Sequence, residues 1–257
     1  MGVVEMTIGQ FAIIYLLLLV VLFIMKKAQI NQTKLLLLAS FRMTVQLVLA
    51  GLVLTYILGN PHPLFTVAYI LAMTTFATLR VLGKNKGINQ KFKLAIGLSL
   101  ACAGTLVVFF FVQIVVGMDF FNPQYTIPLS GMIFGNAMTG LTLALKTFRE
   151  SLAAQRNRIE SLLYVGVAPR KILLPFVNNA LETALLPTMN SMLGMGIISL
   201  PGMMTGQILS GTLPMTAILY QIAIMIAITT VVCLSVFSAL YFGYRTLYNE
   251  RNQIIFE

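Results

Sequence analysis

The Lys and Arg residues of this 257-residue chain gather in four short segments, and the stretches between them are apolar and long enough to cross a lipid bilayer. Loops rich in Lys and Arg stay on the cytoplasmic side of a membrane, so each cluster is predicted to mark an inner end. The clusters are Lys26, Lys27, Lys34 and Arg42; Arg80, Lys84, Lys86, Lys91 and Lys93; Lys146, Arg149, Arg156, Arg158, Arg170 and Lys171; and Arg245 and Arg251.

Composition excludes a soluble protein. Hydrophobic residues make up 58% of the chain and charged residues only 9%, whereas about 25% of a soluble domain is charged. The net charge of +10 would suit nucleic acid only on a polar surface, and here the charges stand at the ends of apolar stretches. The predicted partner is therefore the lipid membrane and not nucleic acid. No long polar insertion interrupts residues 1–257, so we expect a single transmembrane domain.

One topology places every basic cluster inside. It is an all-α integral membrane protein with about seven transmembrane helices, an outer N-terminus and a cytoplasmic C-terminus. With six or eight helices, at least one basic cluster would lie on the outer side of the membrane. The helices are expected at residues 7–25, 35–58, 64–82, 92–116, 127–147, from about 172 onward, and 214–244.

The longest polar stretch ends in a bend between two helices. Residues 160–175 predict a short helix closed by Gly166, which tolerates left-handed backbone, and a new helix with Pro169 in its first turn. One interpretation is a docking elbow that transmits a partner's movement into the membrane. The other is an ordinary capped connection between helices.

This stretch resembles the coupling loop of ABC transporter permeases, although Ser161 and Leu162 stand where two alanines are usual. The resemblance implies that residues 148–175 form a cytoplasmic loop that receives the ATPase. The residues that carry it are Glu160, Gly166, Ala168, Pro169 and Pro175.

A longer match covers most of the chain and resembles the FetB (YbbM) family of ABC permeases. It implies a multi-pass protein of a bacterial plasma membrane that exports iron with a separate ATP-binding subunit, two permeases pairing with two ATPases. Plant members are linked to aluminium tolerance. The matching strings are Arg42-x-x-x-Gln46-Leu47, Pro128-Leu-Ser-Gly-Met-Ile-Phe-Gly-Asn-Ala-Met138, Leu186-Pro-Thr188, Ser199-Leu-Pro-Gly-Met-Met-Thr-Gly206 and Tyr220-Gln221.

The chain lacks a phosphate-binding loop for ATP. Its nearest Gly-Lys pair, Gly83 and Lys84, is followed by Asn85 and has no glycine five residues before it. We therefore expect this chain not to be an enzyme and to hold no cofactor. ATP and Mg²⁺ are expected on the partner subunit.

The sixth helix has a polar face. At roughly 100° per residue its polar side chains fall within an arc of about 140°, and an ionisable residue inside a membrane helix is a candidate functional site. They either line a solute pathway or are satisfied inside the bundle. The candidates for pathway lining are Asn178, Asn179, Glu182, Thr183 and Asn190.

Two strings place glycines four residues apart, which favours close helix packing. The alternative is an outer gate of interrupted helices. These candidates are Gly131, Gly135, Asn136, Pro201, Gly202, Met203, Met204 and Gly206. Nearby thioethers suit soft metals but are also ordinary packing groups; they belong to Met189, Met192, Met195, Met203 and Met204.

Arg42 and Gln46 share a helix face one turn apart. Arg42 either extends to the inner interface or links to another helix. The chain has one His, His62, and no Cys/His cluster, so no metal site is assigned.

These patterns favour the permease subunit of an ATP-driven ABC transporter that exports iron or another metal-related solute. Two alternatives remain open. One is an ion-gradient-driven carrier in which Glu182 titrates, and the other is a membrane scaffold that transports nothing.

Overall fold

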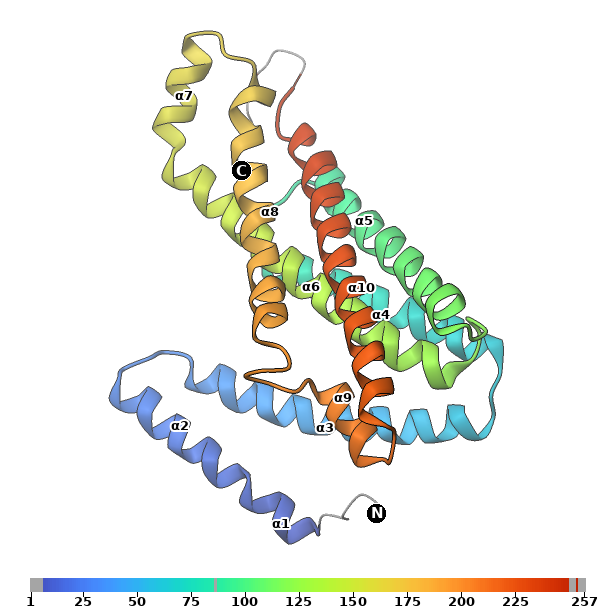
Figure 1. The fold of residues 1–257 in the computed structure, drawn as a ribbon. Coiled ribbons are helices and arrows are strands. Elements are labelled where there is room, and N and C mark those ends of the chain that lie inside the picture. Colours follow the sequence, from blue (N-terminus) through green and yellow to red (C-terminus); the bar gives the residue numbers. More distant parts are fainter. Residues whose placement is uncertain (1–6, 86, 250–252, 254–257) are drawn as a thin grey trace. The chain divides into compact units, whose positions relative to one another are not determined.

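The computed structural model describes residues 7–85, 87–249 and 253, and within these the backbone is helical apart from short connections and one isolated bridge between Met195 and Ser199 (Figure 1). Lys86 and Arg251 of the basic clusters lie outside the described residues. The helices are α1 (Ile8–Ile13), α2 (Tyr15–Lys27), α3 (Thr33–Gly59), α4 (Pro63–Lys84), α5 (Gln90–Phe109), η1 (Phe110–Val116), α6 (Pro123–Ala154), α7 (Arg156–Tyr164), α8 (Pro169–Gly194), α9 (Gly202–Leu209), α10 (Pro214–Gly243) and η2 (Tyr244–Thr246).

Six helical segments of the described chain are long and apolar enough to span a bilayer, which confirms an all-α, multi-pass membrane protein. They are Gly9–Lys27, Thr33–Gly59, Pro63–Lys84, Gln90–Val116, Pro123–Ala154 and Pro214–Thr246.

The predicted sixth crossing corresponds to α8. Its 26 residues extend about 39 Å at 1.5 Å per residue, more than the roughly 30 Å of a hydrocarbon core. Two basic residues in its first turn and several amides make α8 more polar than the six apolar spans. The seventh crossing and the sidedness of the chain therefore stay predictions.

Contacts within the described residues group the chain into two compact units. The first unit contains α1, α2 and α3 together with Gly206–Thr212. Within it, the Tyr15 hydroxyl and the Thr44 hydroxyl form a hydrogen bond that joins α2 to α3. The predicted first helix is divided at Ile14 into α1 and α2.

The second unit contains residues 62–205 and 213–257, and its core lies where α4, α5, α6, α8 and α10 pack together. Three described glycines allow close approach in this core. A Cβ on Gly104 of α5 would overlap the Phe134 ring of α6, one on Gly243 of α10 would overlap the Phe92 ring of α5, and one on Gly140 of α6 would lie 2.7 Å from Val232 of α10. Side chains larger than hydrogen would force these helices apart.

Helix α6 is longer than predicted. It continues to Ala154, so residues 148–154, which the sequence places in the coupling loop, are its last turns. The apolar side chains Phe148 and Leu152 are buried there and hold the extension on the core. Helix α7 then lies between the ends of α6 and α8, at one end of the second unit (Figure 1).

Candidate functional site

The bend between α7 and α8 has the local geometry that Gly166 and Pro169 predict. Gly166 has φ +85°, its N–H donates to the Leu163 carbonyl at 2.9 Å, and the Val167 N–H donates to the Leu162 carbonyl at 3.0 Å. This pair of bonds is a Schellman motif, in which glycine adopts left-handed backbone at low cost. Pro169 is buried and begins α8. The turn is thus held by its own backbone.

Helix α7 has an inner and an outer face. Ile159 is fully buried against the core and Leu162 packs beside it, while Glu160 accepts a 2.8 Å hydrogen bond from the Arg156 guanidinium on the same helix. At the outer tip, Tyr164 is 89% exposed and Val165 is 83% exposed. We call these two residues the elbow tip.

The remaining predicted elbow residues flank this tip. Ala168 is exposed and caps the start of α8, and Pro175 lies exposed inside α8. An exposed aromatic and a β-branched side chain, anchored from behind, have the character of a protein contact point. Docking of an ATPase at the elbow tip stays a prediction.

The polar residues of α8 lie on the face away from the core. Asn178, Asn179, Glu182 and Asn190 are exposed, and Thr183 is half-buried with its hydroxyl bonded to the Asn179 carbonyl. The opposite face packs on the core through Ile172, Leu173, Phe176, Val177, Ala180 and Ala184. The role of the polar residues of α8 in lining a pathway stays a prediction.

A cavity of about 270 Å³ lies between α6, α8 and α10. Its volume is several times the roughly 30 Å³ of a water molecule, so a partly hydrated ion fits. We call it the inter-helix cavity. It is lined by Met132, Asn136, Thr139, Gly140, Leu143, Ala184, Pro187, Thr188, Ser191, Met195, Pro201, Gln221, Met225 and Ile228.

Several hydrogen-bond donors of this lining are already used. The Thr139 hydroxyl donates to the Gly135 carbonyl at 3.0 Å, the Ser191 hydroxyl to the Pro187 carbonyl at 2.9 Å, and the Asn136 amide to the Met132 carbonyl at 2.8 Å. Donation to the same helix leaves the side-chain oxygens with free lone pairs. The cavity therefore presents mainly acceptors.

Gln221 is the buried amide of this lining. It is 4% exposed, its Nε2 lies 3.7 Å from the Met195 sulfur, and its Oε1 has no hydrogen-bond partner in the described structure. A buried unpaired carbonyl oxygen costs about 1–3 kcal/mol. Amide and hydroxyl oxygens with the thioethers of Met132, Met195 and Met225 make a neutral site suited to a cation.

The sequence predicts only part of this cavity. Asn136, Pro201 and Met195 belong to the predicted gate and methionine groups, and they line it. Thr139, Ser191 and Met225 were missed, and Met132 and Gln221 were noted only within the strings of the family resemblance. The sequence signal that could have identified Gln221 is its position as an amide directly before a long apolar run in α10.

Of the four predicted glycines, Gly131 lies at a close contact with a neighbouring helix, and Gly135, Gly202 and Gly206 do not. A Cβ on Gly135 or Gly202 would meet nothing within 4 Å, and one on Gly131 would lie 3.2 Å from the flexible end of Met73. Met203 is half-buried and Met204 buried within α9, whose last residues, from Gly206, belong to the first unit. Close helix packing is therefore not observed at Gly135 and Gly202. The outer-gate hypothesis stays untested.

Arg42 and Gln46 are both exposed on α3 in the first unit. Among the described residues, no three His, Cys, Asp or Glu side chains come together as a metal-binding group. A cation that enters the inter-helix cavity would therefore meet neutral ligands.

A known protein family matches nearly the whole chain. The model of "Uncharacterised protein family (UPF0014)" covers residues 8–248. The chain belongs to this family. The matched region includes residues of both compact units and the whole of α6 to α10.

Named UPF0014 relatives align over most of their length. The chain is 30% identical to the "Probable iron export permease protein FetB" of Escherichia coli over 98% of this chain and 96% of that protein. It is 32% identical to the protein "ALUMINUM SENSITIVE 3" of Arabidopsis thaliana over 83% and 77%. It is also 32% identical to a UPF0014 membrane protein of Synechocystis over 88% of each. No solved structure matches the chain.

Proposed function

We propose that this protein is the membrane-spanning permease of an ATP-driven exporter of a metal cation, with iron as the first candidate, in a bacterial plasma membrane. Family membership and the names of its relatives support a permease that handles metal. The observation that carries the ATP-driven mechanism is the elbow tip, where Tyr164 and Val165 are exposed on a bend that Gly166 and Pro169 hold.

The ATP-binding partner docks on the elbow tip. Helix α7 is anchored through Ile159 and continuous with α8 through a hydrogen-bonded turn, so a force on the tip is passed to α8 as a rigid element. Two walls of the inter-helix cavity are α6 and α8, the helices on either side of α7. Closure of the ATPases would thus change the cavity's shape.

The cargo passes through the inter-helix cavity as a partly dehydrated cation. Neutral oxygens and thioethers replace some of its water ligands. Binding by such neutral groups is weak enough to permit release, which a transport pathway requires. The metal is the substrate here and is not held as a resident cofactor.

Two copies assemble around the polar face of α8. A charged side chain facing lipid near the middle of a membrane costs about 2.5–3.5 kcal/mol on insertion scales, and Glu182 is exposed beside Asn178 and Asn179. A second permease covering this face would remove that cost. It would pair with two ATP-binding subunits.

Glu182 also supports a second candidate function, an ion-gradient-driven carrier. Its carboxylate is exposed on the polar face of α8 and forms no ion pair among the described residues. In that case efflux continues after ATP depletion, stops when the proton gradient is collapsed, and is lost in Glu182→Gln.

Cellular metal content tests the proposal. A strain lacking this protein, loaded with iron, will retain more iron than the parent strain, because export is lost. Reintroduced wild-type protein will restore the parent level, measured by elemental analysis alongside manganese, zinc and copper. If the deletion strain loses the complex with the ATPase but keeps the parent content of all four metals, only the scaffold hypothesis remains.

A further inference from the structure

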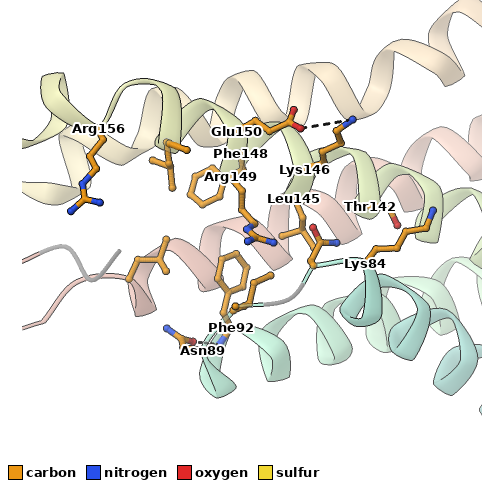
Figure 2. Close-up of a pocket in the computed structure, with 16 residues that line it drawn as sticks. Lys84, Asn89, Phe92, Thr142, Leu145, Lys146, Phe148, Arg149, Glu150 and Arg156 are labelled. Carbon is orange, nitrogen blue, oxygen red and sulfur yellow. Dashed lines mark hydrogen bonds and ion pairs between the residues drawn. The ribbon is translucent and has the colours of Figure 1, made fainter. Parts of the chain in front are cut away.

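A second and larger cavity lies outside the proposed transport route. It has a volume of about 930 Å³, within the usual range for small-molecule sites. Its walls are the connection from α4 to α5, the last turns of α6 and the beginning of α7, all in the second unit (Figure 2). We call it the basic cavity because four basic residues and one acidic residue line it, namely Lys84, Lys146, Arg149, Arg156 and Glu150.

Two of these cations are already paired. The Lys146 ammonium lies 3.8 Å from the Glu150 carboxylate, and Arg156 binds Glu160 at 2.8 Å. Lys84 and Arg149 make no ion pair with any described carboxylate. Among the described residues that line the cavity, two positive charges therefore have no carboxylate partner.

Arg149 is the central group. Its side chain extends from α6 toward the connection between α4 and α5 (Figure 2), and a Cβ on Gly87 would lie 3.7 Å from its Nη2. Lys84, the last residue of α4, lines the same cavity from the facing wall. Each of these two groups suits an anionic headgroup, and the planar guanidinium of Arg149 can bind a phosphate through two N–H groups.

The facing wall is held in place by two asparagines. The buried Asn85 donates to the Val81 carbonyl at 2.9 Å. Asn89 accepts from the Phe92 N–H at 2.7 Å and donates to the Thr246 carbonyl at 2.9 Å, which ties the start of α5 to η2. The polar wall is therefore built before any ligand binds.

The rest of the lining is apolar. Phe92 and Phe148 meet edge to face with ring centroids 6.5 Å apart, and Leu145, Leu152 and Leu247 surround them. Phe92, Phe148 and Leu145 are themselves buried, so a ligand meets apolar surface at Leu247 and Ala153 and along the alkyl parts of the basic side chains. A free phosphate gains nothing from this surface, whereas the glycerol and first acyl carbons of a lipid bury part of it. The ligand that fits both walls is amphiphilic.

The position of the cavity along the helices agrees with the position of lipid headgroups in a bilayer. Apolar spans end at Lys84 and begin again at Gln90, so the cavity lies where the helices leave the hydrocarbon region, at the predicted inner surface. Anionic lipids make that surface negative, and basic pockets between helices on this side bind their headgroups. We propose that the basic cavity binds the phosphate of an anionic glycerophospholipid at Arg149, with Lys84 adding positive charge to the same cavity.

Lipid binding to the purified permease in detergent tests this proposal. Native mass spectrometry should show phosphatidylglycerol retained in preference to phosphatidylcholine with the same acyl chains. Arg149→Gln should weaken phosphatidylglycerol binding about fivefold, and Arg149→Gln with Lys84→Gln about 25-fold, since each cation near the surface contributes comparably. Lys91→Gln is the matched control. It removes an equal charge from α5 beside the cavity without altering its lining, and binding should stay within about twofold of wild type.

Four results would overturn the proposal. Equal retention of the two lipids would remove the preference for an anionic headgroup, and an equal loss in Lys91→Gln would show that net charge alone attracts lipid. Displacement of phosphatidylglycerol by millimolar inorganic phosphate would assign the cavity to free phosphate. If Arg149→Gln lowers recovery of the ATP-binding subunit but leaves lipid binding unchanged, the cavity contacts that partner.

Discussion

Replacing both residues of the elbow tip, Tyr164→Ser with Val165→Ser, will lower the affinity of the permease for its ATP-binding subunit by about 30-fold or more. A central aromatic contact in a protein interface contributes about 2 kcal/mol or more, which corresponds to this factor. Because both side chains are more than four-fifths exposed, their removal leaves the core intact. The measurement is the amount of ATP-binding subunit recovered with affinity-tagged permease, together with the thermal midpoint of the permease alone.

Leu213→Ser provides the matched control. Leu213 is 74% exposed and precedes α10, so the change removes a comparable apolar group away from the elbow. The control should bind the ATPase like wild type. Full ATPase recovery with the doubly substituted tip, or equal loss with Leu213→Ser, would contradict docking at the tip.

Gln221→Leu will reduce metal transport at least tenfold without lowering the stability of the fold. The side chains are similar in size, but leucine has no oxygen to offer a cation in the inter-helix cavity. Gln221 Oε1 is buried and unpaired in the described structure, so its loss should leave the thermal midpoint unchanged or raise it. The two readouts are metal efflux and the thermal midpoint of the purified protein.

Ser99→Ala separates this effect from a general change in buried polarity. Ser99 is a buried polar residue of α5 that lines neither cavity. It should transport metal at the wild-type rate. Efflux by Gln221→Leu at the wild-type rate would exclude the inter-helix cavity from the route, whereas a lower thermal midpoint would assign Gln221 a structural role.

The features that the sequence predicts well are local. Apolar length locates the spans because a helix of about 20 apolar residues crosses a bilayer whatever its neighbours are. The elbow is predicted for the same reason, since Gly166 and Pro169 set the backbone within one turn of themselves. The extension of α6 to Ala154 was missed because its polar residues resemble a loop, while Phe148 and Leu152 bury the opposite face.

The inter-helix cavity could not be predicted because its residues come from three helices distant in sequence. Periodicity places Glu182 and Asn178 on one face of α8, but does not say which neighbour that face meets. The glycine spacing likewise selects Gly135 and Gly202, whereas the closest contacts occur at Gly104, Gly140 and Gly243. Close approach depends on a bulky side chain on the facing helix, here Phe134, Val232 or Phe92, and this pairing is a property of the packed structure.

The central claim is that ATP hydrolysis by a partner drives a metal cation outward through this permease. The most direct measurement is Fe²⁺ movement into inside-out proteoliposomes that contain the purified permease and its ATP-binding subunit. We predict accumulation that requires hydrolysable ATP, is absent with a non-hydrolysable analogue and is lost with Gln221→Leu. Accumulation that proceeds without ATP and follows an imposed proton gradient would contradict the account.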